Sequence, residues 1–204
     1  MYVKAVNPNM TAEIAPGDTV KAGLVISNSE VGLGSVNVQP LIYRELNGSG
    51  IAVSGTAAKR IHRGRVHSAD DHFLLASQEV LTEADRAFLD DLQATVRRAT
   101  DEALFSQIVT LMRNAETQAM NTADIPAVVH TASRDFGITD TEQTGVLHQL
   151  MAGSDFSLYG LANAVTRFSQ DVESYDRATD LESIGYKILT MPKKQWSRIT
   201  SMAA

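Results

Sequence analysis

The sequence of 204 residues contains no cysteine. This absence excludes disulfides, thiolate nucleophiles, iron–sulfur clusters and cysteine-based zinc sites, and it fits a reducing compartment. Long hydrophobic runs are also missing: no stretch of about 18 apolar residues occurs, so we expect no membrane-spanning segment. The first six residues lack the apolar region of a secretory signal. We therefore expect a cytoplasmic protein without a membrane partner.

Several motifs that carry chemistry are absent as well. Glycines crowd the first third of the chain, yet neither a P-loop nor a dinucleotide fingerprint followed by a helix occurs. No serine lies in a nucleophile-elbow context. His62, His67 and His72 recur every five residues, a spacing that suits neither one helix face nor one strand face. We therefore predict no cofactor and no metal site.

The net charge of −6 is unevenly distributed along the chain. Residues 1–68 hold seven Lys and Arg against four Asp and Glu, which gives +3. Residues 69–204 hold eleven against twenty, which gives −9. A basic front joined to an acidic back favours a local site for a polyanion over general coating of nucleic acid.

The first third of the chain is typical of β-strands joined by short turns. We predict strands at residues 20–27, 35–46, 51–54 and 59–67. The Pro16-Gly17-Asp18 sequence opens the first of them, and Asn47-Gly48 is a strong hairpin signal. Pro40 predicts an edge position or a bulge for its strand, because proline cannot donate to the sheet.

Helical periodicity begins near residue 81. We predict one helix from there to about residue 115, followed by helices at 126–137, 139–153, 157–172, 177–189 and 193–202. The fold class is therefore predicted to be α+β, with a small, mainly antiparallel sheet in residues 1–68 and a helical part in residues 69–204, the two together forming one compact unit. The predicted helical core consists of Phe88, Leu92, Val96, Ile108, Leu111, Leu147, Leu150, Leu161 and Val165.

The most distinctive local feature is a basic run at residues 59–67. On a strand its cations would point to both faces, so neither face could be buried without partners. The run suits phosphate binding, from nucleic acid or a nucleotide. The alternative is a solvated edge strand whose charges deter pairing with other edges. The predicted nucleic-acid-binding residues are Lys59, Arg60, His62, Arg63, Arg65 and His67.

A second polar cluster follows the apolar residues 20–26. Asn28 and Glu30 lie in a Ser-Asn-Ser-Glu block that either forms a turn or presents its side chains at the end of a strand. Arg44 joins them as a possible site residue, and an ion pair between Arg44 and Glu30 stays open at this stage.

Several blocks resemble a phage- and plasmid-like protein family, domain of unknown function 932. The blocks are Gly17-Asp18, residues 23–32 (GLVISNSEVG), 40–44 (PLIYR), 159–167 (YGLANAVTR) and 176–182 (DRATDLE), with His62, Arg65 and Trp196. Family members often have a cysteine-containing segment where residues 45–48 stand here, and usually carry more chain before the position of Met1. The resemblance implies residence in a prophage or plasmid of a bacterial cell. It supplies no established activity and no catalytic residues.

Three functions remain open from the sequence. The first is a nucleic-acid-binding accessory protein of a mobile element, acting in replication or recombination. The second is an enzyme on a phosphorylated or nucleic-acid substrate, with Glu30, His62 or His67 as acid–base groups. The third is a structural protein that works through a homo-oligomer. We favour binding over catalysis because no catalytic constellation is visible in the sequence.

Overall fold

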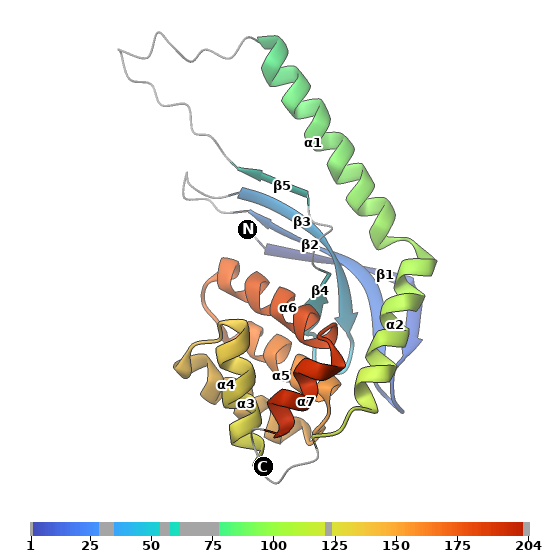
Figure 1. Cartoon of the computed structure of the whole chain (residues 1–204). Helices are drawn as coiled ribbons and strands as arrows, with labels where there is room; N and C mark the ends of the chain where they lie inside the picture. The colour runs from blue at the N-terminus through green and yellow to red at the C-terminus, as the bar shows by residue number, and fades with distance from the viewer. Residues whose placement is uncertain (1, 29–34, 54–57, 62–77, 121–123, 202–204) are drawn as a thin grey trace, which may run out of the picture.

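The computed structural model describes residues 2–28, 35–53, 58–61, 78–120 and 124–201. Within these ranges five β-strands precede seven α-helices and one short 3-10 helix (Figure 1). This arrangement confirms the α+β class, with the antiparallel sheet in the N-terminal third. The predicted border at residue 68 lies outside the described residues, so the division into two parts stays a prediction.

The strands form one antiparallel sheet in the order β1-β2-β3-β4, with β5 also paired to β3. Their bounds are β1 (Tyr2–Glu13), β2 (Thr19–Asn28), β3 (Ser35–Arg44), β4 (Gly50–Ala52) and β5 (Ala58–Ile61). The strand β1 was not predicted. Its apolar residues do not alternate with period two over its length, and its pairing with β2 shifts between Val6 and Thr11. Irregular pairing of this kind removes the alternation that identifies a strand in a sequence.

Pro40 lies in a central strand, so its predicted edge position is wrong. β3 pairs with β2 along one side, where Pro40 is opposite Leu24. Along the other side residues 35–38 pair with β5, and residues 41–43 pair with β4. Pro40 thus falls in the gap where β3 changes its neighbour, and its missing N–H costs no ladder hydrogen bond on that side. Its carbonyl still accepts from the N–H of Val53 at 2.8 Å.

Most helix ends follow the sequence signals. Asp124, Thr139 and Ser157 each cap a helix through a side-chain oxygen, and Thr139 forms a capping box with Glu142, as the Thr-Asp-Thr-Glu sequence at residues 139–142 indicates. Gly137 ends α3 in the left-handed region at φ 69°. The bounds are α1 (Gln78–Ala99), α2 (Glu102–Glu116), α3 (Ile125–Phe136), α4 (Asp140–Gly153), α5 (Leu158–Phe168), η1 (Ser169–Asp171), α6 (Tyr175–Leu189) and α7 (Lys193–Ser201).

The predicted long helix is two helices, and this changes which residues are buried. α1 ends at Ala99, and the Asp101 carboxylate caps α2 by accepting from the N–H groups of Ala103 and Leu104. The break resets the helical phase, so a periodicity counted across it does not identify the buried face of α2, and Leu111, predicted for the core, is 39% exposed. Val96, also predicted for the core, lies before the break and is 40% exposed, because the buried face of α1 carries Thr95 and Ala99 instead.

Helices cover both faces of the sheet. On one face Ala22, Ile42 and Val53 line a small space with Leu104 and Phe105 of α2. The helix α1 lies along β3 and β5 (Figure 1).

Lys4 is opposite Val25 and therefore lies on the other face from Ala22, because side chains alternate along a strand. There it forms a 2.7 Å ion pair with the buried Glu182 of α6. Val20 lies on the same face as Ala22 and belongs to the main core, which also contains Leu161 and Val165 of α5. None of the described helices is long and apolar enough to cross a membrane.

Candidate functional site

The predicted basic strand is described only at its start. Lys59 and Arg60 belong to β5, which among the described strands pairs with β3 alone. The other four predicted binding residues, His62, Arg63, Arg65 and His67, lie outside the described residues, and so does Glu30.

The sheet register brings Asn28 and Arg60 into one cross-strand row. Asn28 at the end of β2 is opposite Val36 of β3, and Val36 is opposite Arg60 of β5. The two positions are thus two strand spacings apart, roughly 10 Å. The next row contains Ser27, Asn37 and Lys59 in the same strand order. One end of the sheet therefore gathers polar and basic residue types from three strands.

Arg44 lies at the opposite end of β3, and its partner is Asp18 in the turn before β2. The Arg44 Nε donates to Asp18 Oδ1 at 2.5 Å, and Nη2 donates to Oδ2 at 2.8 Å. This bidentate arrangement matches the planar guanidinium to both carboxylate oxygens. Burial disfavours the charged guanidinium, but its hydrogen bond to Asp18 and nearby negative groups raise the pKa of Arg44 overall. The arginine therefore stays charged.

Tyr159 of α5 completes this network. Its hydroxyl donates to Asp18 Oδ2 at 2.9 Å, and the Arg44 guanidinium carbon lies 5.7 Å from the centre of its ring. Burial, together with the Asp18 charge, raises the pKa of Tyr159 well above its usual range. The phenol therefore keeps its proton and acts as a hydrogen-bond donor.

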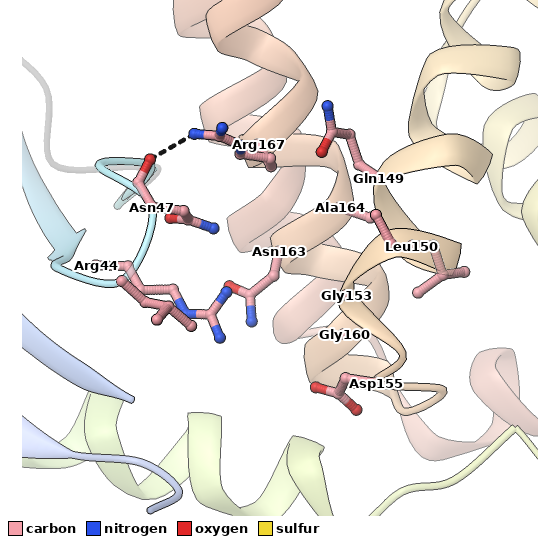
Figure 2. A pocket seen from close by; sticks show the side chains of 12 residues that line it. Arg44, Asn47, Gln149, Leu150, Gly153, Asp155, Gly160, Asn163, Ala164 and Arg167 are labelled. Atoms are coloured by element: carbon pink, nitrogen blue, oxygen red, sulfur yellow. Dashed lines mark hydrogen bonds between the residues drawn. The ribbon is translucent and has the colours of Figure 1, made fainter. Parts of the chain in front are cut away.

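A cleft of about 320 Å³ lies beside this network. The turn between β3 and β4 forms one wall, and the end of α4 and one face of α5 form the other (Figure 2). Leu46, Leu150 and Ala164 supply apolar surface. The polar lining residues are Arg44, Asn47, Gln149, Asp155, Asn163 and Arg167.

Arg167 links α5 to the β3–β4 turn by a hydrogen bond at the top of the cleft in Figure 2. Its Nη1 donates to the carbonyl oxygen of Asn47 at 2.6 Å and to Gln170 Oε1 at 3.0 Å. Gln149 is held from α4, where its Nε2 donates to Asp171 Oδ2 at 3.0 Å. The cleft walls are thus fixed by hydrogen bonds between elements far apart in the sequence.

Asn163 lies at the centre of the cleft, and its side chain points into it (Figure 2). The residue is only 7% exposed. It approaches the Tyr159 hydroxyl closely enough to favour the phenolate, but its Nδ2 has no hydrogen bond of acceptable geometry in the described structure. A buried donor without a partner is uncommon in folded proteins.

Sequence reasoning identified Arg44 but missed the other main residues of the cleft and the network: Asp18, Tyr159, Asn163 and Arg167. One signal was available, because Asn163 and Arg167 are polar residues four positions apart in an otherwise apolar segment. Asp18 carried no such signal, since it resembles an ordinary turn residue.

No set of three or more His, Asp or Glu side chains suited to a metal ion occurs in the described parts of the chain. The three evenly spaced histidines lie outside those parts. No protein-family model, curated protein or solved structure matches the chain. The resemblance to the phage- and plasmid-like family therefore stays an expectation from the sequence.

Proposed function

We propose that this protein is a nucleic-acid-binding accessory protein of a mobile element, acting in replication or recombination, and that the β5 end of its sheet contacts phosphates. The observation that supports the proposal most directly is the register that aligns Asn28 with Arg60 and Ser27 with Lys59. A strand edge with basic and amide residues can contact a phosphate backbone through several donors at once. The remaining four basic residues follow β5 directly in the sequence.

The placement of β5 also fits this proposal electrostatically. Most of the negative charge belongs to residues 69–204, and β5 lies at the end of the sheet away from α3, α4 and α7 (Figure 1). A polyanion approaching that end would avoid the repulsion of these three helices. α1 contacts β5 and carries more acidic than basic residues, so the favoured approach is from the side that α1 leaves open.

The test measures binding to a single-stranded and a double-stranded oligonucleotide by fluorescence anisotropy over a series of salt concentrations. Replacing Arg60, Arg63 and Arg65 together by Ala should weaken binding. The slope of log affinity against log salt should also become shallower by about 0.7 to 0.9 for each phosphate that the variant no longer neutralises, or about 2 to 3 in total. Circular dichroism should show that the variant remains folded.

The matched control replaces three exposed arginines of the helices, Arg97, Arg98 and Arg134, by Ala. This control removes the same net charge as the first variant but at positions outside β5. If the β5 end contacts the phosphates, the control should therefore lower affinity far less. Equal reductions of affinity in the two triple variants would mean that binding depends on net charge alone and not on the β5 end. Absence of binding by the unaltered protein at about 50 mM salt, where weak electrostatic contacts still act, would remove the proposal. The charges of residues 59–67 would then be left with the role of protecting a sheet edge.

A further inference from the structure

We propose that the cleft between the β3–β4 turn, the end of α4 and α5 binds a small organic molecule that carries a carboxylate or phosphate group. Asn163 and Arg167 are the residues that hold this group. The site lies at the other end of β3 from β5 and does not depend on the function proposed above.

The geometry of α5 places both donors on one surface. Asn163 and Arg167 are four residues apart, so their side chains are neighbours along the helix. Both line the cleft, whereas Leu161 and Val165 of the same helix are fully buried in the core. One stripe of α5 thus packs the core, and another presents two nitrogen donors to the open space.

The Asn163 side chain supplies the independent sign of a ligand. Its Nδ2 is a buried donor without a hydrogen bond in the described structure, and the side chain points into the cleft (Figure 2). An unpaired buried donor lowers stability, since the group has lost its hydrogen bonds to water without replacement. An oxygen of a molecule bound in the cleft would restore that bond.

Arg167 supplies the charge. Its Nη1 is committed to Asn47 and Gln170, which orients the guanidinium. Neither Nε nor Nη2 has a hydrogen bond to any residue that the structure describes, so these donors are available to an oxyanion. A guanidinium matches carboxylate and phosphate in geometry as well as charge. Because it is held before binding, little side-chain entropy is lost when the ligand arrives.

The charges around the cleft direct the anion to the Arg167 end. The positive charge of Arg44 is already balanced by Asp18. The carboxylate of Asp155 lies before the start of α5, whereas Arg167 lies in its last turn. The 11 residues of the helix, roughly 16 Å in length, separate these two regions of opposite charge. An anionic group is therefore attracted to Arg167 and repelled from Asp155.

The apolar part of the lining defines the rest of the ligand. Leu46, Leu150 and Ala164 offer surface for a hydrophobic body next to the anionic group. A volume of about 320 Å³ is near the lower limit of small-molecule sites. The site thus suits a compact molecule, not a polymer.

Nuclear magnetic resonance titration of the ¹⁵N-labelled full chain tests this proposal with three probes: benzoate, phenyl phosphate and the neutral benzamide. We expect at least one of the two anions to cause saturable shifts of the Asn163 side-chain amide and the Arg167 Nε–H. Benzamide has the same ring without the charge and should bind about tenfold or more weakly. The comparison between the two anions distinguishes a carboxylate site from a phosphate site.

Two variants identify the residues. Asn163→Leu keeps the approximate shape of the side chain and removes the donor, so it should weaken anion binding about tenfold. Its melting temperature should fall little, because the Nδ2 donor that it removes has no hydrogen bond of acceptable geometry. Arg167→Gln should weaken binding at least as much, and the exposed Arg97→Gln is its control. Arg167 also holds the turn at Asn47, so weaker binding in Arg167→Gln could come from loosening of that turn. Asn163→Leu leaves the bond between Arg167 and Asn47 in place, so weaker binding in that variant reports removal of a ligand contact.

Three results would each overturn the proposal: no saturable shift with either anion, equal affinity for benzamide and the tighter-binding anion, or unaltered affinity for that anion in Asn163→Leu. Replacement of Lys59 and Arg60 by Gln should leave binding of the anionic probe unchanged. If this pair of changes abolished it, the anion would be bound at the β5 end and not in the cleft.

Discussion

At the scale of single residues, Asp18 connects parts of the chain that are far apart in the sequence. Its carboxylate accepts two hydrogen bonds from Arg44, which is 26 positions away, and one from Tyr159, which is 141 positions away. The carboxylate is almost completely buried, so its negative charge needs these donors. The turn before β2, the end of β3 and the first turn of α5 are therefore held at one point.

Tyr159→Phe tests this network. The variant removes one hydrogen bond to a buried charge, and we expect the free energy of unfolding to fall by about 1.5 to 3 kcal/mol. Urea denaturation followed by circular dichroism measures the change. A double-mutant cycle with Asp18→Asn should give a coupling energy above about 0.5 kcal/mol. If the two effects were simply additive, the Tyr159 hydroxyl would not depend on Asp18.

The sequence pointed to Arg44 as a possible site residue but not to its surroundings. Two of the Arg44 nitrogens bond Asp18. The pairing with Glu30 that the sequence left open involves a residue outside the described ranges. Asn163 and Arg167 could have been found, because two polar residues at helical spacing stand out in an apolar segment. Their convergence with Arg44 and Asn47 could not have been predicted from the sequence, since it depends on how α5 packs against the β3–β4 turn. Local residue patterns carry no information about such long-range packing.

At the scale of secondary-structure elements, α4 is fixed at its start by more than its capping box. Glu142 accepts two hydrogen bonds from Arg177 of α6, both at 2.7 Å, and a third from the N–H of Thr139 at 2.9 Å. Arg177 also donates to the carbonyl oxygen of Gly137 at 2.9 Å. The start of α4, the end of α3 and the first turn of α6 thus share one side chain.

This arrangement predicts a dependence of stability on pH. The hydrogen bonds from Arg177 hold the pKa of Glu142 at about 2, below its usual value of about 4.5. A carboxylate with a lowered pKa in the folded state stabilises the fold above its unfolded pKa. That contribution is lost as the pH falls through the folded pKa. The stability that Glu142 contributes should therefore decline between about pH 5 and pH 2.

The measurement is the free energy of unfolding of the unaltered protein and of Glu142→Gln across this pH range. Glu142→Gln should be less stable by about 1 to 2 kcal/mol at pH 7, and the difference should shrink toward pH 2. A difference that is constant with pH would mean that the ionised carboxylate contributes nothing beyond the neutral amide.

Most element boundaries on the C-terminal side could be predicted, because Thr139, Ser157 and Gly137 are strong local signals for helix ends. The prediction failed where no such signal was read. Asp101 is a capping residue inside a continuous apolar periodicity, so the break between α1 and α2 was missed. The periodicity predicts a start of this helix near residue 81, whereas α1 already begins at Gln78.

At the scale of the whole molecule, one core joins the sheet to the helices. It includes Val20 and Ile42 of the sheet together with Ile108 of α2 and Leu161 of α5. The exposed Val96 and Leu111 lie outside it, and Phe88 and Leu92 of α1, which were also predicted for the core, are only partly buried. This distinction corrects the predicted core and gives a direct comparison between two leucines.

Leu161→Ala should lower the free energy of unfolding by about 2 to 5 kcal/mol, because it leaves a cavity in a closed part of the core. Leu111→Ala removes the same atoms from a side chain that is 39% exposed and should cost about 1 kcal/mol or less. Both values come from urea denaturation at one temperature. Similar costs for the two variants would show that Leu111 is buried in solution.

The long separation between Asp18 and Tyr159 has a consequence for synthesis on the ribosome. All five described strands are made before residue 62, but α5, which donates the Tyr159 hydroxyl and shares one hydrophobic core with Val20 and Ile42, is made about a hundred residues later. At roughly 5 to 20 residues per second, the nascent sheet waits several seconds or more with part of its apolar face uncovered. The order of translation therefore exposes the N-terminal third to aggregation until the later helices, α5 and then α6, have been made.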